Sequence, residues 1–198
     1  MRKLLLSAAF AAAALFCSAA AFAAPAQVIF IRHAEKPGNS NELSEKGFRR
    51  AQALVKFFLS EPAVTRYGPP AAIYAAAPKH EDSSIRSIQT VTPLAKAVRL
   101  SINKDFTRGE TRKLARSIMQ NPAYEGKMVL VCWQHGALVD AVRDLAEESG
   151  ASQKLLKALP LEWPDEIFDR AWILDFDRGS AASFRNIPQR LLPGDSVK

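Results

Sequence analysis

The chain has 198 residues, 48% of them hydrophobic and 24% charged, and its formal net charge at neutral pH is +7. This length suits one domain that buries a sizeable apolar core. The positive charge favours anionic substrates or surfaces. Because no run of Lys or Arg with interleaved aromatic residues is present, the composition argues against a nucleic-acid partner.

Residues 1–23 have the pattern of a bacterial signal peptide. Arg2 and Lys3 form a basic start, residues 4–16 are almost entirely apolar, and the final triplet AFA places small residues where a signal peptidase cleaves. A transmembrane anchor is disfavoured, because the apolar run is shorter than the roughly 20 residues that span a bilayer. We therefore expect residues 24–198 to form one periplasmic or secreted domain, without stable membrane insertion. Its net charge is +5, because the leader contains two basic residues and no acidic one.

The rest of the chain alternates short apolar runs, which are typical of buried strands, with longer stretches of helical periodicity. Strands are predicted at residues 28–31, 71–76, 100–102 and 127–133, with a terminal hairpin of residues 170–176 and 183–187. Helices are predicted at 45–60 after Ser44 as N-cap, from 83 or 84 to 98 with an irregularity at Pro93, at 110–119, and from 135 to 148. This order predicts an α/β fold, a three-layer α/β/α sandwich with a mostly parallel central sheet, helices on both faces and the terminal hairpin at the edge.

Two of the three histidines, His33 and His135, lie just past the ends of predicted buried strands. In open α/β sheets the carboxyl ends of the strands meet at one edge, where ligands collect. A single histidine in such a place is more often structural, but the pair predicts one shared crevice.

Two arginines indicate what this crevice binds. Arg32 directly precedes His33, and Arg86 falls in the first turn of the helix that leaves the second strand. The planar guanidinium group binds phosphate in a bidentate way that Lys cannot, so two such groups predict a phosphoryl site. Arg86 alone would be interpreted as an exposed helix residue.

Four ordered segments resemble the histidine phosphatase superfamily, in its branch 1, which includes phosphoglycerate mutases. They span residues 27–142 and consist of the strand at 28–31 with RHAE behind it, the LSEKG run at 43–47, Arg86 with Gln89 and Thr90, and the strand that delivers His135. The resemblance implies that His33 attacks phosphorus and that Arg32, Arg86 and His135 bind the phosphoryl oxygens, with help from Asn39. No cofactor is expected.

The residue that protonates the leaving group is less clearly indicated. Glu110 lies 24 residues beyond Arg86, close to the acidic residue of branch 1 members, and is the first choice. The simpler interpretation of Glu110 is a helix N-terminal residue that complements the dipole. Glu81 and Asp82 are the rivals.

The loop before Arg86 is longer than in most relatives, and its Lys79 and His80 are predicted to contact substrate, although a solvated loop is the simpler interpretation. Asp165 and Glu166 are less favoured substrate contacts. The three histidines are 47 and 55 residues apart and lack the spacing of a metal site, so no metal is expected.

We therefore expect an exported, metal-independent phosphoric monoester hydrolase that acts on a small phosphorylated molecule through a phosphohistidine at His33. A phosphosugar, a nucleotide and an envelope phosphate are the open substrate classes, and no oligomeric state is indicated. The alternatives are a phosphoglycerate mutase-like phosphotransferase and a non-catalytic phosphate-binding domain.

Overall fold

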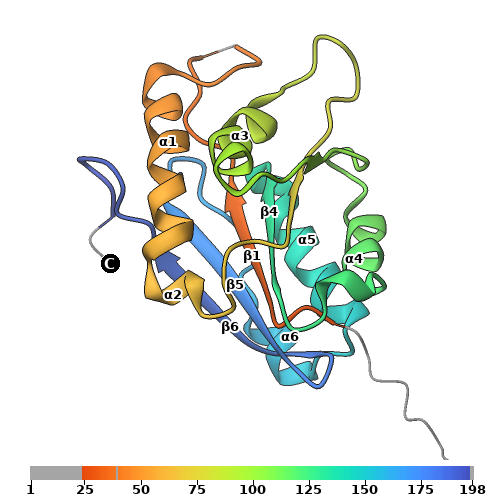
Figure 1. The fold of residues 1–198 in the computed structure, drawn as a ribbon. Helices are drawn as coiled ribbons and strands as arrows, with labels where there is room; N and C mark the ends of the chain where they lie inside the picture. The colour runs from red at the N-terminus through yellow and green to blue at the C-terminus, as the bar shows by residue number, and fades with distance from the viewer. Residues whose placement is uncertain (1–23, 39, 197–198) are drawn as a thin grey trace, which may run out of the picture.

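The computed structural model describes residues 24–38 and 40–196, so the predicted leader and Asn39 lie outside the described part of the chain. A six-stranded sheet lies between two layers of helices, as the sequence predicted (Figure 1). Within these residues, no helix has the length and apolar character needed to cross a bilayer.

The elements follow the predicted order, with short additions. They are β1 (Gln27–Arg32), α1 (Glu45–Ser60), α2 (Pro62–Thr65), β2 (Ala72–Ala75), α3 (Arg86–Val98), β3 (Ile102–Asn103), α4 (Thr111–Met119), a 3-10 turn (Pro122–Tyr124), β4 (Met128–Trp133), α5 (His135–Glu148), α6 (Gln153–Ala158), β5 (Arg170–Asp177) and β6 (Ser180–Pro188). Helices α2 and α6 were not predicted. Helix α3 begins at Arg86, later than predicted, and runs through Pro93 without a break.

The sheet has the strand order β3-β2-β4-β1-β5-β6. Strands β3, β2, β4 and β1 pair in parallel, whereas β5 pairs antiparallel with both β1 and β6. Strands β5 and β6 form the predicted hairpin at the sheet edge. Its two-residue turn, Arg178-Gly179, has positive φ at both positions (49° and 85°), as a twisted hairpin requires.

Each face of the sheet carries its own apolar core, because successive side chains of a strand point to opposite faces. In β1, Ile29 and Ile31 pack beneath α1, α2 and α3, while Val28 and Phe30 pack beneath α4, α5 and α6 (Figure 1). Burial on both faces explains why β1 and β4 are continuous apolar runs.

The start of α1 is fixed against the loop that follows β1. Ser44 caps the helix as predicted, since its hydroxyl accepts a hydrogen bond from the Gly47 amide at 3.1 Å. The Ser44 amide in turn donates to the Glu35 carbonyl at 2.9 Å. A Cβ atom at Gly47 would lie 2.3 Å from that carbonyl oxygen, so the close contact requires glycine. Helix α1 therefore holds the loop that carries His33.

Candidate active site

The carboxyl ends of β1, β4 and β2 lie side by side, and the predicted site residues follow them. Arg32 at the end of β1 is in register with Trp133 at the end of β4, and the His33 amide donates to the Trp133 carbonyl at 2.9 Å. On the other side of β4, Ala75 of β2 is in register with Cys132. Parallel pairing thus brings His33, His135 and the loop toward Arg86 to one edge of the sheet.

A cavity of about 360 Å³ opens at this edge. His33 and Arg86 both line it, together with Gln134, which directly precedes His135. The other lining residues come from the loop before α3, from its first turn and from the loop before α4: Ala76, Ala77, Pro78, Lys79, Ser83, Ser84, Ser87 and Arg108. The described lining contains no Asp or Glu, so the cavity suits an anion.

The tautomer of His33 follows from its hydrogen bond. Its Nδ1 lies 2.8 Å from the Ala34 carbonyl oxygen, which can only accept, so Nδ1 carries the proton. The Ala34 amide donates to the Thr90 hydroxyl at 2.8 Å, and that hydroxyl donates to the Arg86 carbonyl at 2.8 Å. This chain of bonds fixes the imidazole relative to Arg86. It leaves Nε2 with a lone pair, as a nucleophile requires.

The surroundings of His33 keep the ring neutral. Burial, together with the charges of Arg86, Arg32 and His135, lowers its pKa to about 4, against the raising effect of the hydrogen bond to Ala34. Because these charges act on the His33 ring, the side chains of Arg32, Arg86 and His135 lie within electrostatic range of it.

The Arg32 guanidinium is held from the segment that precedes β5. Its Nη1 donates to the carbonyl oxygens of Asp165 and Ile167, the latter at 3.0 Å, and its Cζ lies 3.8 Å from the ring centre of Phe168. The same Phe168 ring lies 6.2 Å from the ring of His33. Burial lowers the Arg32 pKa to about 10, an effect that the nearby Asp165 carboxylate partly offsets.

Both arginines keep an unused donor. Arg86 Nη1 donates to the Ser40 carbonyl at 2.7 Å, and burial lowers the pKa of this arginine. The Nε atoms of Arg32 and Arg86 are buried without a hydrogen-bond partner among the described residues. Buried donors of this kind are normally satisfied, so two of them beside one histidine fit a bound anion.

His135 is the first residue of α5, and its Nε2 lies 2.6 Å from Oδ1 of Asp165. Burial lowers its pKa, and the charge of Arg32 adds to this effect while Asp165 opposes it. The Asp165 carboxylate therefore pairs with the histidine that the family resemblance implied as a ligand of the phosphoryl oxygens.

The structure does not bring Glu110 to this cluster. Its carboxylate accepts hydrogen bonds of 2.9 Å from both the amide and the hydroxyl of Thr107, and it pairs with Lys113 at 2.7 Å. The bond from Lys113, followed by those from Thr107, lowers its pKa to about 2. Glu110 also lines a separate surface depression together with Asp140 and Asp144. Its geometry fits the simpler interpretation of a residue at a helix start.

The long loop before α3 contributes only in part. Lys79 lines the cavity, whereas His80 is exposed outside the lining, and its backbone amide donates to the Ser83 hydroxyl. Glu81 and Asp82 are also exposed and do not line the cavity. Asn39 lies outside the described residues.

Sequence analysis missed Arg108 as a site residue. It lines the cavity from the loop between β3 and α4, and its carbonyl accepts a 2.8 Å hydrogen bond from Trp133 Nε1. A signal was available, but Arg108 lies six residues beyond the end of the predicted strand at 100–102, whereas His33 and His135 each lie two residues beyond theirs. The short β3, of two residues, made that signal weak.

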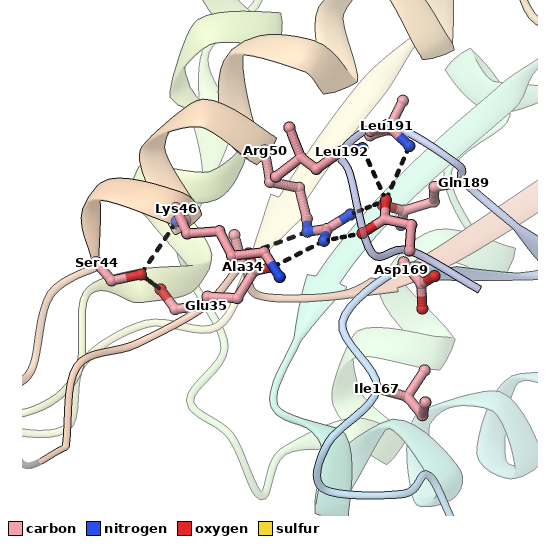
Figure 2. Close-up of polar contacts among 12 residues, drawn as sticks. Ala34, Glu35, Ser44, Lys46, Arg50, Ile167, Asp169, Gln189, Leu191 and Leu192 are labelled. Atoms are coloured by element: carbon pink, nitrogen blue, oxygen red, sulfur yellow. Dashed lines mark hydrogen bonds and ion pairs between the residues drawn. The ribbon is translucent and has the colours of Figure 1, made fainter.

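A buried polar network joins the loop after His33 to helix α1 and to the C-terminal segment (Figure 2). Glu35, two residues after His33, accepts two hydrogen bonds from Arg50 of α1, at 3.0 and 2.7 Å. Arg50 also donates to Asp195 near the C-terminus, and the Leu191 and Leu192 amides bind the same aspartate.

The C-terminal segment also reaches the other side of the site. Ser196 donates to the buried Asp169 from its backbone amide and, at 3.2 Å, from its hydroxyl. Asp169 directly follows Phe168, whose ring contacts Arg32. Residues 189–196, which we call the C-terminal clasp, thus connect the loop after His33 with the segment that holds Arg32.

Among the described residues, no group of three or more His, Cys, Asp or Glu side chains is arranged to hold a metal ion. Cys132 is buried and free, and burial raises the pKa of its thiol. It lies on the sheet face opposite Trp133 and fills the core beneath α3.

No protein-family model and no curated protein matches the sequence. Two solved structures share its architecture. The mycobacterial glucosyl-3-phosphoglycerate phosphatase is 13% identical, with a TM-score of 0.53 over 82% of this chain and 97% of that one. The phosphoglycerate mutase from Plasmodium falciparum is 18% identical, with a TM-score of 0.50 over 87% of this chain and 96% of that one. Such identities speak to the fold, and on that ground the chain has the fold of the histidine phosphatase superfamily, as its sequence motifs predicted.

Proposed function

We propose that this protein is a phosphoric monoester hydrolase that forms a phosphohistidine at His33 and needs neither metal nor cofactor. One observation carries the proposal: a buried, neutral imidazole with its proton fixed on Nδ1 lines an acid-free cavity beside Arg86. A neutral ring nitrogen next to fixed positive charge is the arrangement that phosphoryl transfer to histidine requires.

In the first step, Nε2 of His33 attacks phosphorus, and the bond from phosphorus to the leaving oxygen breaks. The Arg32 and Arg86 guanidinium groups bind the equatorial phosphoryl oxygens, and their unused Nε donors become satisfied. As the imidazole gains positive charge, the Ala34 carbonyl stabilises the proton on Nδ1. His135 donates to a further oxygen once the Asp165 carboxylate has moved aside.

The leaving oxygen must gain a proton, and we assign this role to Asp165. Its carboxylate contacts the cluster through His135, whereas Glu110 is bound elsewhere. In the second step, water attacks the phosphohistidine, gives its proton to Asp165 and releases phosphate, which restores His33.

The comparisons support this proposal at the level of fold. Of the two proteins with this fold described above, one is named a phosphatase and the other a mutase of a phosphorylated molecule. We further propose an exported location, for which the leader pattern of residues 1–23 is the support. A small phosphorylated metabolite or an envelope phosphate is the substrate that we expect.

Hydrolysis of 4-nitrophenyl phosphate by the purified mature protein tests the proposal. Wild type should release phosphate and, after rapid acid-free denaturation, carry acid-labile phosphate. His33→Ala should show neither property. His80→Ala is the matched control, because it removes a histidine outside the cavity, and it should behave as wild type. Equal rates for wild type and His33→Ala would refute the proposed activity.

A further inference from the structure

We call Arg32, Arg86 and His135, the proposed ligands of the scissile phosphoryl group, the phosphoryl clamp. Two further cationic side chains of the cavity do not belong to this clamp. Lys79 lines it from the loop before α3, and Arg108 lines it from the loop before α4. Both residues are exposed and therefore lie at the rim of the cavity, whereas Arg86, which also lines it, is half-buried. The cavity is therefore basic both at its base and at its opening.

No carboxylate lies within ion-pair distance of Lys79 or Arg108 among the residues that the structure describes. On the neighbouring helix α4 the situation differs, because Arg112, Lys113 and Arg116 each pair with an acidic side chain. The charges of Lys79 and Arg108 are thus left for a ligand or for solvent.

The position of Arg108 is set by the core of the protein. Its carbonyl accepts the hydrogen bond from Nε1 of the fully buried Trp133, which lies two residues before His135 on β4. Arg108 is also close enough to His135 for its charge to lower the pKa of that histidine. The hydrogen bond thus fixes the backbone of Arg108 beside the strand that leads to His135, while the Arg108 side chain is exposed.

The cavity also has room for more than one phosphoryl group. Its volume of about 360 Å³ falls in the range of small-molecule sites. Ser83, Ser84 and Ser87 also line the cavity. Hydroxyl groups in that place suit a polar, hydroxylated leaving group such as a sugar.

We infer that Lys79 and Arg108 form a second anion-binding subsite, and that the substrate is a phosphomonoester whose leaving group carries another phosphate or a carboxylate. This inference rests on the proposed function and narrows its substrate class. The scissile phosphate binds at His33, and the second anionic group binds at the rim. Since the rim is exposed, salt weakens this second contact more than the buried clamp.

A matched pair of substrates tests the inference: a hexose monophosphate and the corresponding hexose bisphosphate. Wild type should show at least about tenfold higher kcat/KM for the bisphosphate, the effect expected of two exposed charge contacts. The double variant Lys79→Gln/Arg108→Gln should lose most of this preference. The control Arg49→Gln/Lys56→Gln removes the same two charges from the exposed side of α1 and should keep it. A diphosphorylated glycolipid in detergent should be compared with its monophosphorylated form in the same way. A preference for the diphosphorylated glycolipid over the hexose bisphosphate would indicate an envelope substrate, and the reverse would indicate a soluble one.

Binding to the inactive His33→Ala variant separates this inference from the proposed function. Calorimetry should give a Kd for the bisphosphate about tenfold below that for the monophosphate, and adding Lys79→Gln/Arg108→Gln should remove the difference. This result would support the subsite even if wild type hydrolysed nothing. Equal affinities for the two ligands, or a preference that survives the double substitution, would overturn it.

Discussion

Arg50 and Asp195 are separated by 145 residues in the chain, and their side chains join through hydrogen bonds of 2.8 Å from Nη1 and 2.6 Å from Nη2. Both side chains are buried, at 2% and 4% exposure. Arg50 binds Glu35 on its other edge, so one guanidinium group connects the C-terminal clasp to the loop after His33 (Figure 2). The end of the chain therefore contributes to holding the site.

Replacing Asp195 by Asn should destabilise the protein by roughly 2 kcal/mol, because Arg50 loses one of its two buried carboxylate partners. The loss should be smaller than for Glu35→Gln, which also loosens the loop at His33. Chemical denaturation of both variants measures this order. Glu45→Gln, at the exposed first turn of α1, is the control. Wild-type stability of the Asp195→Asn variant would contradict the role of the clasp.

The Arg50–Asp195 pair predicts that the stability of the protein depends on pH. Burial would raise the pKa of Asp195, but hydrogen bonds from Arg50 and from the Leu192 and Leu191 amides lower it from 3.8 to about 2. A carboxylate with a lowered folded-state pKa stabilises the protein above the unfolded value of 3.8, and this contribution is lost as the pH falls toward 2. Wild type should therefore lose more stability than Asp195→Asn between about pH 4 and pH 2. Equal slopes in that window would count against the pair.

His33 should be neutral, with its proton on Nδ1, throughout the neutral range. Its pKa of about 4 leaves the ring uncharged above roughly pH 5, and the bond to the Ala34 carbonyl selects the tautomer. Nitrogen-15 NMR of the imidazole distinguishes the two tautomers, and the spectrum of His33→Gln assigns the signal. A proton on Nε2, or protonation near pH 6.5, would contradict the proposed nucleophile.

Two substitutions at Arg86 separate its charge from its shape. Arg86→Gln should raise the His33 pKa, because a nearby positive charge is removed, whereas Arg86→Lys should keep that pKa low. Both should lower kcat/KM at least tenfold, since Lys keeps the charge but loses the two-pronged contact with phosphate. NMR titration and steady-state kinetics measure the two effects. A fully active Lys variant would show that charge alone suffices.

Glu110→Gln should leave the turnover rate nearly unchanged, because the carboxylate is bound to Thr107 and Lys113 and faces away from the cavity lining. The thermal midpoint should fall slightly, since the charge at the start of α4 is lost. Steady-state kinetics on alkyl and aryl phosphates checks the first expectation. A large loss of turnover on the alkyl ester alone would restore Glu110 as the proton donor.

The parts of the site that follow strand ends could be predicted from the sequence. His33 and His135 come just after two apolar runs that were predicted as buried strands. Parallel pairing of these strands at the sheet centre brings the two positions together, whatever the length of the loops between them. The Ser44 cap was predictable because it depends on a local contact: the amide that donates to its hydroxyl is only three residues away.

The contacts between distant polar residues could not be predicted. The helical period of α1 places Arg50, unlike its exposed neighbour Arg49, on the buried face, but its partner there, Asp195, lies at the far end of the chain and could not be predicted. The prediction that Glu110 belongs to the site was wrong for a local reason. Its spacing from Arg86 suggested a shared site, but local partners three residues away on each side determine where its carboxylate points. Helices α2 and α6, of four and six residues, are too short for a periodic pattern.

Asp165→Asn should slow the hydrolysis of alkyl phosphates at least tenfold more than that of 4-nitrophenyl phosphate. An alkoxide needs a proton as it leaves, whereas 4-nitrophenolate leaves without one, so only the first substrate depends on a general acid. The variant should also bind inorganic phosphate more tightly, because a negative charge beside His135 is removed. Glu166→Gln removes the same charge one residue further on and should show neither effect. An equal loss on both substrates would mean that Asp165 acts by orienting His135 and that the proton comes from another group.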